Sequence, residues 1–464
     1  MLNGAIGERI NDNCNMHNES FIMNCDPFNE MLYCIEHDED VELSILIDQC
    51  RDLDSILCSF DKVMSPKKFG EPQVVFNTAL SSKFSFRVYE ILLAMIFTTE
   101  EISKYPELLP NVTLGYEIYD SCTTVAGALE GAMRLLTGQR MTIPNYHCQT
   151  ISSPVAVIGE SYSVTSIPMA RLLGLYRFPQ ISYAATVMGL SDKRQFPSFL
   201  RTIPSDLFQA IAIAHLVLYF GWTWVGVMSD SSDYGLQGSH KVKEELVKAG
   251  ACIAFFETIS GLYSEIRIQH ISKIIQTSSV NVIVIYATEV NLYPVMEVIA
   301  MNNVTGKVWI ASDGWAQFYL FSKTYFWRTL EGTLGFLVRK GDIPGFRQYI
   351  YNLSPFNNPD DIFLKHFWEI VFDCNLQVLN NIFKTNENLT KESKLCAGDE
   401  TLEGNSLDFF KLTDLRNTYN VYNAMYSIAH ALHDMISCRH GEGPFHNGTC
   451  TAIHDFQPWQ LIDL

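Results

Sequence analysis

VAVIGESYSVTSIPMARLLGLYRFPQISYAATVMGLSDKRQFPSFLRTIPSD, residues 155–206, contains two short apolar runs, each followed at once by a polar turn. The first run is Val155–Ile158, and its turn contains Ser161, Ser163, Thr165 and Ser166. The second run is Ile181–Tyr183, and its turn contains Ala184, Ala185 and Thr186. A strand that ends in such a turn and leads into a helix presents backbone N–H groups to a small anion. Two such turns predict a small-molecule site at the carboxyl ends of parallel strands.

From residue 150 onward, short β-rich runs alternate with longer helical runs. The predicted strands are Val155–Ile158, Trp224–Met228, Cys252–Phe256, Asn281–Ala287, Val308–Ala311 and Thr333–Val338. The predicted helices are Asp206–Tyr219, Leu236–Ala249, Ser264–Thr277, Asn291–Asn302 and an apolar stripe within Tyr422–Met435. This alternation predicts an α/β fold in which helices flank mostly parallel sheets.

One uncharged segment, Ile211–Met228, has the length of a short membrane span. Gly221 divides it, and the part from Trp222 is aromatic and β-branched, as strands are. We therefore expect a helix that runs into a buried strand.

Composition limits the classes of function. The 464 residues exceed what one hydrophobic core usually organises, so two lobes are expected. The net charge of −18 argues against a nucleic-acid partner and against docking on an anionic membrane surface. The segment Gly159–Ser163 resembles a nucleophile elbow, but Ser163 stands where that motif needs Gly. The sequence has no phosphate-binding loop and no zinc-protease motif, so an enzyme is not expected.

Twelve cysteines and six N-glycosylation sequons favour an oxidising compartment. The sequons begin at Asn18, Asn111, Asn303, Asn352, Asn388 and Asn447. Cys374 with Cys396 and Cys438 with Cys450 each close a short polar loop, which predicts two disulfides. No cysteine or histidine pair near them has zinc-ligand spacing, so no metal site is expected there.

The segments LLGLYRFPQISYAAT, FPSFLRTIPSD, FGWTWVGVMSDSSDYG, VTGKVWIASDGWA and FHNGTC resemble the extracellular ligand-binding domain of class C G-protein-coupled receptors. The resemblance extends roughly from residue 80 to the C-terminus, and the vomeronasal type 2 receptors look closest, with calcium-sensing and taste receptors nearby. Residues 1–70 match poorly, and Val41–Ile47 is only a rough counterpart of the first strand of the family.

The resemblance implies a two-lobed clamshell of the periplasmic-binding-protein type, a Venus flytrap. Lobe 1 is expected to comprise residues 71–203 and 341–464, with a loop-rich surface insertion at 355–415, and lobe 2 to comprise residues 204–340. Residues 1–70 would form a cysteine-rich N-terminal segment.

The resemblance also implies an amino-acid site. Ser163 and Thr186 would hold the α-carboxylate with the backbone near Ala184, and Arg87 would lie at the rim. The α-ammonium group would face Asp206, Tyr234, Thr288 and Asp313. Each residue has a plainer alternative, such as a turn hydrogen bond for Ser163, a first-turn acid for Asp206 or a solvated charge for Arg87.

For the remaining cysteines, the resemblance implies an interchain disulfide at Cys148 and a bridge from Cys252 to a following cysteine-rich domain. Cys122 would pair with Cys58 or Cys50. An alternative that stays open is that Cys148 pairs with an N-terminal cysteine of its own chain.

The implied protein is a receptor ectodomain at the outer face of the plasma membrane. It would sense an amino acid, a related small molecule or a peptide, and signal through a homo- or heterodimer formed by lobe 1. A cysteine-rich domain, a seven-helix domain and a G protein would complete the pathway; we expect this chain, without a signal peptide or membrane span, to be a fragment. The resemblance also allows bound Ca²⁺, which no sequence motif supports. A stand-alone periplasmic-type binding protein and a secreted α/β hydrolase are the alternatives.

Overall fold

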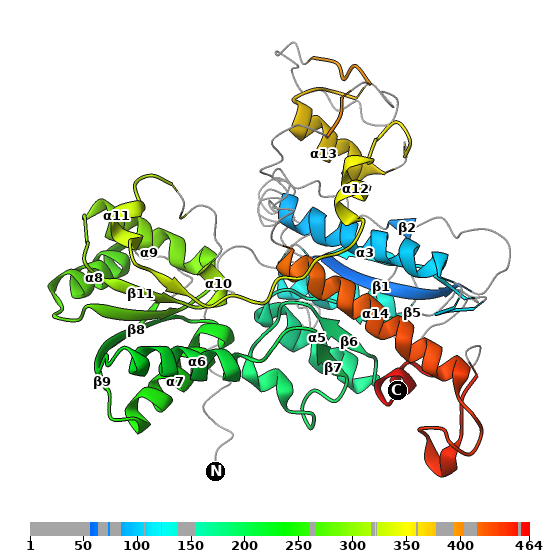
Figure 1. Ribbon diagram of the computed structural model, residues 1–464, viewed down its shortest axis with the longest axis horizontal. Helices are drawn as coiled ribbons and strands as arrows, with labels where there is room; N and C mark the ends of the chain where they lie inside the picture. Colours follow the sequence, from blue (N-terminus) through cyan, green and yellow to red (C-terminus); the bar gives the residue numbers. More distant parts are fainter. Residues whose placement is uncertain are drawn as a thin grey trace, which may run out of the picture. The chain divides into compact units, whose positions relative to one another are not determined.

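The computed structural model describes residues 56–63, 73–74, 85–105, 107–110, 112–121, 123–137, 154–259, 265–316, 321, 323–358, 361–376, 394–398, 400–402, 415–452 and 456–464. These residues form two sheets, each flanked by helices (Figure 1). We call the part built on the sheet with β1 and β5 lobe 1, and the part built on the sheet with β8 and β10 lobe 2.

The sheet of lobe 2 is parallel throughout, in the order β12-β11-β10-β8-β9. Its strands are β8 (Trp224–Asp230), β9 (Cys252–Ile259), β10 (Val282–Tyr286), β11 (Val308–Ala311) and β12 (Leu334–Gly335). Every residue of the central strand β10 is buried, as expected for a parallel strand that is covered on both faces. The predicted strands of this region are confirmed, although β12 is shorter than Thr333–Val338.

Two pairs of helices cover the sheet of lobe 2. Helices α6 (Asp206–Tyr219) and α7 (Asp233–Lys248) share one core with the sheet, and α8 (Glu265–Thr277) and α9 (Glu289–Met301) share the other (Figure 1). Two short helices, α10 (Asp313–Ala316) and α11 (Trp327–Leu330), follow β11. The alternation of strands and helices read from the sequence is thereby confirmed.

The boundary between α6 and β8 follows from local chemistry. Ser205 caps the start of α6, where its hydroxyl accepts a hydrogen bond from the backbone of Leu207. Gly221 adopts a φ of 70° just after the helix, a conformation that glycine adopts without strain, and the chain then enters β8. The uncharged segment from Ile211 is thus a helix followed by a strand, as expected. Among the described residues, no helix has both the length and the apolar character that crossing a membrane requires.

The sheet of lobe 1 has the order β2-β4-β1-β5-β6-β7, with β3 paired to β1. Its strands are β1 (Ile56–Val63), β2 (Gln73–Val74), β3 (Thr113–Leu114), β4 (Glu117–Asp120), β5 (Pro154–Ile158), β6 (Gln180–Ser182) and β7 (Phe199–Arg201). Strand β1 runs antiparallel to β3, β4 and β5, whereas the other pairs are parallel. The segment Val41–Ile47, expected as a counterpart of the first strand, lies outside the described residues.

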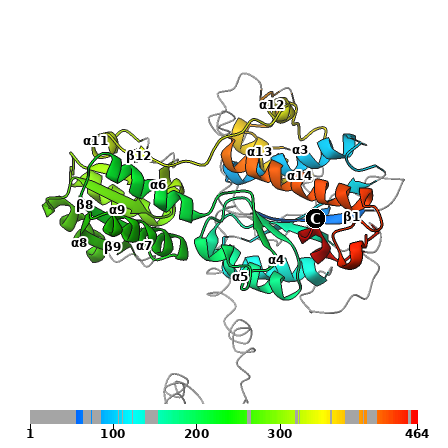
Figure 2. The same cartoon turned by 60° about the horizontal axis from the view of Figure 1, so that its bottom comes forward.

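Helices cover both faces of this sheet. Figure 2 shows α3 (Phe86–Lys104) and α14 (Arg416–Ser437) on one face and α4 (Val125–Thr137) and α5 (Ser163–Leu175) on the other. The apolar stripe predicted for α14 is buried against α3, because its members recur at helical spacing; it consists of Met425, Ile428, Leu432 and Met435.

The segment 355–415, expected to be a loop-rich surface excursion, contains a helix that contributes to the core. Helix α13 (Ile362–Phe372) follows α12 (Phe346–Tyr351), and its Leu364, Phe367 and Trp368 are buried in the core of lobe 1. These apolar residues lie at helical spacing, a pattern that outweighs the flanking prolines and polar runs. Short 3₁₀ helices within the described residues are η1 (Met188–Ser191), η3 (His446–Gly448) and η4 (Pro458–Ile462).

Both predicted local disulfides are present, Cys374–Cys396 and Cys438–Cys450. Cys252 is an exposed free thiol. The backbone of Cys58 lies in β1. Cys50, Cys122 and Cys148, together with the sequon residues Asn18, Asn111 and Asn388, lie outside the described residues. Asn303, Asn352 and Asn447 are all exposed, and Asn352 lies at the end of α12.

Candidate functional site

The turns after β5 and β6 lie side by side. The two strands pair in parallel, with Val157 opposite Gln180, so both chains leave the sheet at the same edge. Ser163 begins α5 and is 7% exposed, and Thr186 in the second turn is 4% exposed. The Ser163 hydroxyl accepts a hydrogen bond from the backbone N–H of Val187 at 3.4 Å. The residues expected to hold a carboxylate are therefore neighbours at the N-terminus of one helix.

The buried hydroxyl of Ser182 stabilises the turn after β6 by hydrogen bonds to its backbone. Ser182 Oγ accepts hydrogen bonds from the backbone N–H groups of Ala184 and Ala185, at 3.4 and 2.9 Å. The same hydroxyl donates to the carbonyl of Glu160 at 2.6 Å, which links the two turns. Ser182 ends β6 and lies inside the run Ile181–Tyr183, so its place in the sequence does not distinguish it from an ordinary strand residue.

The turn continues directly to Asp206. The carbonyl of Thr186 accepts a hydrogen bond from the backbone N–H of Asp206 at 2.8 Å. Asp206 is the first residue of α6 and is 1% exposed. One backbone hydrogen bond therefore joins Thr186, which is expected to bind the carboxylate of the ligand, to Asp206, which is expected to face its ammonium group.

Asp206, Tyr286, Tyr234 and Asp313 form a connected cluster, in which the first three are buried and Asp313 is half-buried. Tyr286 OH donates to Asp206 Oδ1 at 2.7 Å, and Tyr234 OH donates to Asp313 Oδ1 at 2.7 Å. The two tyrosine rings lie between the acids, with centroids 4.9 Å apart. Tyr286 ends β10, whereas Asp313 follows β11, so neighbouring strand ends bring the cluster together. Three of the residues expected to face an ammonium group are therefore together.

The electrostatics of the cluster favour a cation. Burial, and after it the nearby charge of Asp313, raise the pKa of Asp206 to about 8, although the hydrogen bond from Tyr286 opposes the rise. Burial likewise raises the pKa of Asp313. Asp206 Oδ2 is buried and accepts no hydrogen bond of normal geometry, although the Thr186 hydroxyl is close enough to lower the pKa. A positively charged donor near Oδ2 would satisfy this oxygen and stabilise the ionised pair.

Thr288, which is expected to face the ammonium group, donates its hydroxyl proton to a buried acid. Its backbone N–H and its hydroxyl both donate to Asp230 Oδ2, each at 2.7 Å, and Asn291 Nδ2 donates to the same oxygen at 3.2 Å. The other oxygen of Asp230 accepts from the backbone N–H of Ser232 at 3.0 Å. Asp230 therefore joins the start of α7 to the start of α9, and the hydroxyl of Thr288 is used in that link.

Arg87 is exposed on α3, and its charge lowers the pKa of Glu289, which burial raises more strongly. Tyr162 OH donates to Glu289 Oε1 at 3.4 Å. Arg87 thus acts on Glu289, a residue that the sequence analysis did not single out.

Two further residues of the cluster were missed. Tyr286 lies in the apolar run VNVIVIYA, and the signal that distinguishes it is a phenol at the carboxyl end of a buried strand. Gly238 lies inside α7, where a Cβ would meet the ring of Tyr286 at 2.2 Å. Glycine in the interior of a helix lowers the stability of that helix. Its presence there therefore indicates a position where another group approaches too closely for a side chain.

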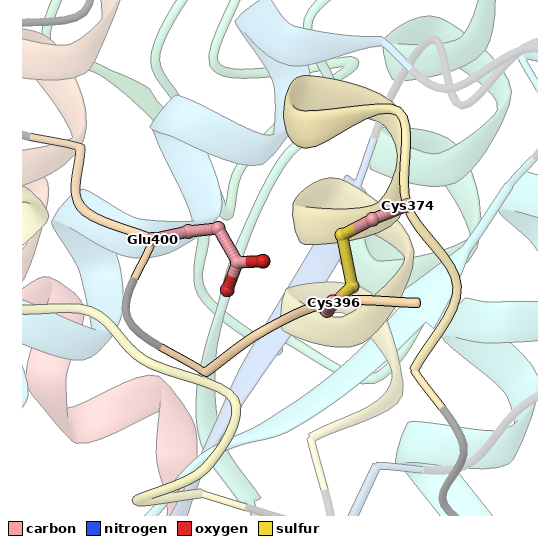
Figure 3. A group of neighbouring side chains, drawn as sticks. All are labelled: Cys374, Cys396 and Glu400. Atoms are coloured by element: carbon pink, nitrogen blue, oxygen red, sulfur yellow. A yellow bond between two sulfur atoms is a disulfide. The ribbon is translucent and has the colours of Figure 1, made fainter. Parts of the chain in front are cut away.

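The potential metal donors Cys374, Cys396 and Glu400 lie together, but the sulfurs are bonded to each other (Figure 3). The carboxylate of Glu400 accepts hydrogen bonds from the backbone N–H groups of Ala397 and Gly398, at 2.5 and 2.9 Å. A disulfide offers no thiolate to a metal. In this cluster the disulfide cross-links two segments of the chain, and Glu400 accepts hydrogen bonds from the turn at 397–398.

The receptor family ligand-binding region matches residues 90–463 of this sequence. The chain belongs to this family. It is 40% identical over 400 residues to the extracellular calcium-sensing receptor of Homo sapiens, a match that covers 82% of this chain and 37% of the relative. It is 29% identical over 393 residues to the human taste receptor type 1 member 1, covering 82% of this chain and 43% of the relative. It is 32% identical over 385 residues to the taste receptor type 1 member 2 of Gorilla gorilla gorilla, covering 81% and 42%.

Membership of this receptor family confirms the two-lobed α/β fold and the resemblance to class C receptors. The chain spans less than half the length of these relatives, at 37 to 43%. The relatives are receptors, in agreement with the expectation that the chain is not an enzyme. The vomeronasal assignment remains a prediction.

Proposed function

We propose that the chain is the ligand-sensing ectodomain of a vomeronasal-like class C G-protein-coupled receptor. Its ligand is an amino acid, or a related small molecule or peptide that presents the same charged ends. The observation that supports this proposal most directly is the buried Asp206 Oδ2, which accepts no hydrogen bond of normal geometry although the rest of its cluster is connected.

The two ends of a zwitterion have complementary partners in this site. The α-ammonium group would donate to Asp206 and Asp313, whose pKa values are raised mainly by burial, so that a bound cation would stabilise their ionised forms. The α-carboxylate would accept from Ser163 and Thr186 at the N-terminus of α5, where backbone N–H groups and the helix dipole favour an anion. The backbone at Ala184 belongs to the same turn.

The wider receptor belongs to the same proposal. Ligand binding would bring the lobes together and change a homo- or heterodimer interface on lobe 1, with Cys148 as the candidate interchain disulfide. The signal would pass through a cysteine-rich domain, reached by Cys252, to a seven-helix domain and a G protein at the plasma membrane. Ca²⁺ is a further candidate ligand, because one relative is named as a calcium-sensing receptor.

Removing either of the two hydroxyl groups proposed to bind the carboxylate, those of Ser163 and Thr186, should weaken the binding of an amino acid. We expect Thr186→Ala to cost about 1–3 kcal/mol, the range for a hydrogen bond to a charged group, and Ser163→Ala to have an effect in the same direction. Calorimetry with a panel of free L-amino acids measures this loss. Thr202→Ala is a matched control, because its hydroxyl donates to the carbonyl of Asn420 instead. Unchanged affinity in both site variants would show that the hydroxyls only stabilise their turns.

A further inference from the structure

Arg201 forms several hydrogen bonds to the turn that contains Thr186. Its Nη1 donates to two carbonyls, that of Ala185 at 3.3 Å and that of Val187 at 3.0 Å. Its Nη2 donates to the hydroxyl of Ser191. Thr186 is the residue between the two carbonyls, so one guanidinium nitrogen fixes the backbone on both sides of it. The planar fork of an arginine suits several acceptors held in one arrangement.

The position of Arg201 in the sheet allows these hydrogen bonds to form. Arg201 is the last residue of β7 and lies opposite Ser182, the last residue of β6. The turn leaves β6 at that point, so the half-buried Arg201 side chain meets it as it leaves the sheet. Other contacts hold the turn elsewhere: the carbonyl of Tyr183 accepts from Asn420 Nδ2 at 3.0 Å, and the N–H of Val187 donates to Ser163.

Arg201 is also coupled to the acid of lobe 2. Burial lowers the pKa of Arg201, and the charge of Asp206 opposes that change. In return, the charge of Arg201 lowers the pKa of Asp206 and so opposes the effect of burial. The backbone N–H of Asp206 is the partner of the Thr186 carbonyl, so one side chain influences both ends of this hydrogen bond.

We propose that Arg201 is a positioning residue that holds Thr186 where it receives the carboxylate of the ligand. The part that concerns the ligand rests on the proposed function. The two arms of the guanidinium fork act on different parts of the turn: Nη1 fixes the two carbonyls beside Thr186, and Nη2 holds the Ser191 hydroxyl at its far end. The charge of the group is secondary. A lysine offers one ammonium group on a longer flexible stem and does not reproduce the fork.

The first test needs no ligand. Hydrogen exchange followed by mass spectrometry, on the intact chain, compares wild type with Arg201→Lys, Arg201→Met and Arg171→Lys. Arg171 is a matched control because it is an exposed arginine of lobe 1 whose guanidinium lies over the ring of Phe196. We expect peptides covering 184–191 to exchange about ten-fold faster or more in both Arg201 variants, while peptides from β8 and β10 stay unchanged. Exchange at 184–191 equal to wild type in both variants would overturn the proposal.

The second test measures affinity. Calorimetry with free L-amino acids and with their carboxamides, which lack the carboxylate, should show a loss of about ten-fold for the free acids in Arg201→Lys and a smaller loss for the amides. If Arg201→Lys binds the free acids as tightly as wild type, the charge alone is sufficient, and the proposed role of the planar guanidinium is wrong. Faster exchange with unchanged affinity would reduce Arg201 to a structural role. If wild type binds no amino acid, the proposed function fails, and the exchange test still decides whether Arg201 holds the turn.

Discussion

Asp313→Asn should weaken the binding of free amino acids by about 2 kcal/mol or more, the scale of a lost charge-assisted hydrogen bond in a buried site. Asparagine keeps an oxygen for Tyr234 OH, which donates to Asp313 Oδ1 at 2.7 Å, and it removes the charge by placing an amide NH2 where the second carboxylate oxygen was. N-acetylated amino acids lack the ammonium group, so their affinity should change much less. Calorimetry with matched pairs of free and acetylated amino acids measures the difference.

An exposed acid provides the control for this experiment. Asp342 is exposed, and Asp342→Asn should leave both affinities unchanged. Equal losses for free and acetylated ligands in Asp313→Asn would mean that Asp313 has a structural role only. The charge of Asp313 raises the pKa of Asp206, so the variant should also lower that pKa and leave some attraction for the ammonium group.

Asp230→Ala should be the most destabilising change near the site, by about 3 kcal/mol or more. Asp230 is fully buried and accepts hydrogen bonds from Ser232, Thr288 and Asn291, so alanine leaves several buried donors without a partner. Chemical denaturation of the purified chain measures the loss of unfolding free energy. Asp233→Ala removes an exposed acid from the first turn of the same helix, and should cost only the few tenths of a kcal/mol typical of the helix dipole. Similar costs for the two variants would contradict the linking role of Asp230.

The sequence predicted the architecture of lobe 2 well because short apolar strands alternate there with longer helical runs, and the central strand is fully buried. A run such as VIVIY in β10 leaves little choice but a strand covered on both faces. Strand β1 was missed because ILCSFDKV lies in a poorly matched region and pairs with distant strands. Long-range pairing of this kind leaves no local signal.

The placement of the expected site residues could be predicted where a residue type and a strand end coincide, while their role in binding stays a prediction. Ser163, Thr186 and Asp313 directly follow strands or begin helices, and the sequence shows both features. Thr288 has the same signature, but its hydroxyl is used by a buried acid of another strand. Tyr286 and Gly238 were missed because their importance lies in one contact between β10 and α7, which neither segment reveals alone.

The central claim is that the buried Asp206 and the half-buried Asp313 together receive the ammonium group of an amino acid. The pKa of Asp206 is raised to about 8 in the ligand-free protein, so its carboxyl is largely protonated at pH 7. A bound ammonium group favours the ionised form, so binding must release a proton, and affinity must rise as the pH rises towards 8. Calorimetric titration of the wild-type chain with free amino acids, at pH 7 in buffers of different ionisation enthalpy, measures the protons exchanged. The account predicts net proton release that shrinks in Asp313→Asn. Binding without proton exchange, or the failure of every free amino acid to bind, would contradict it.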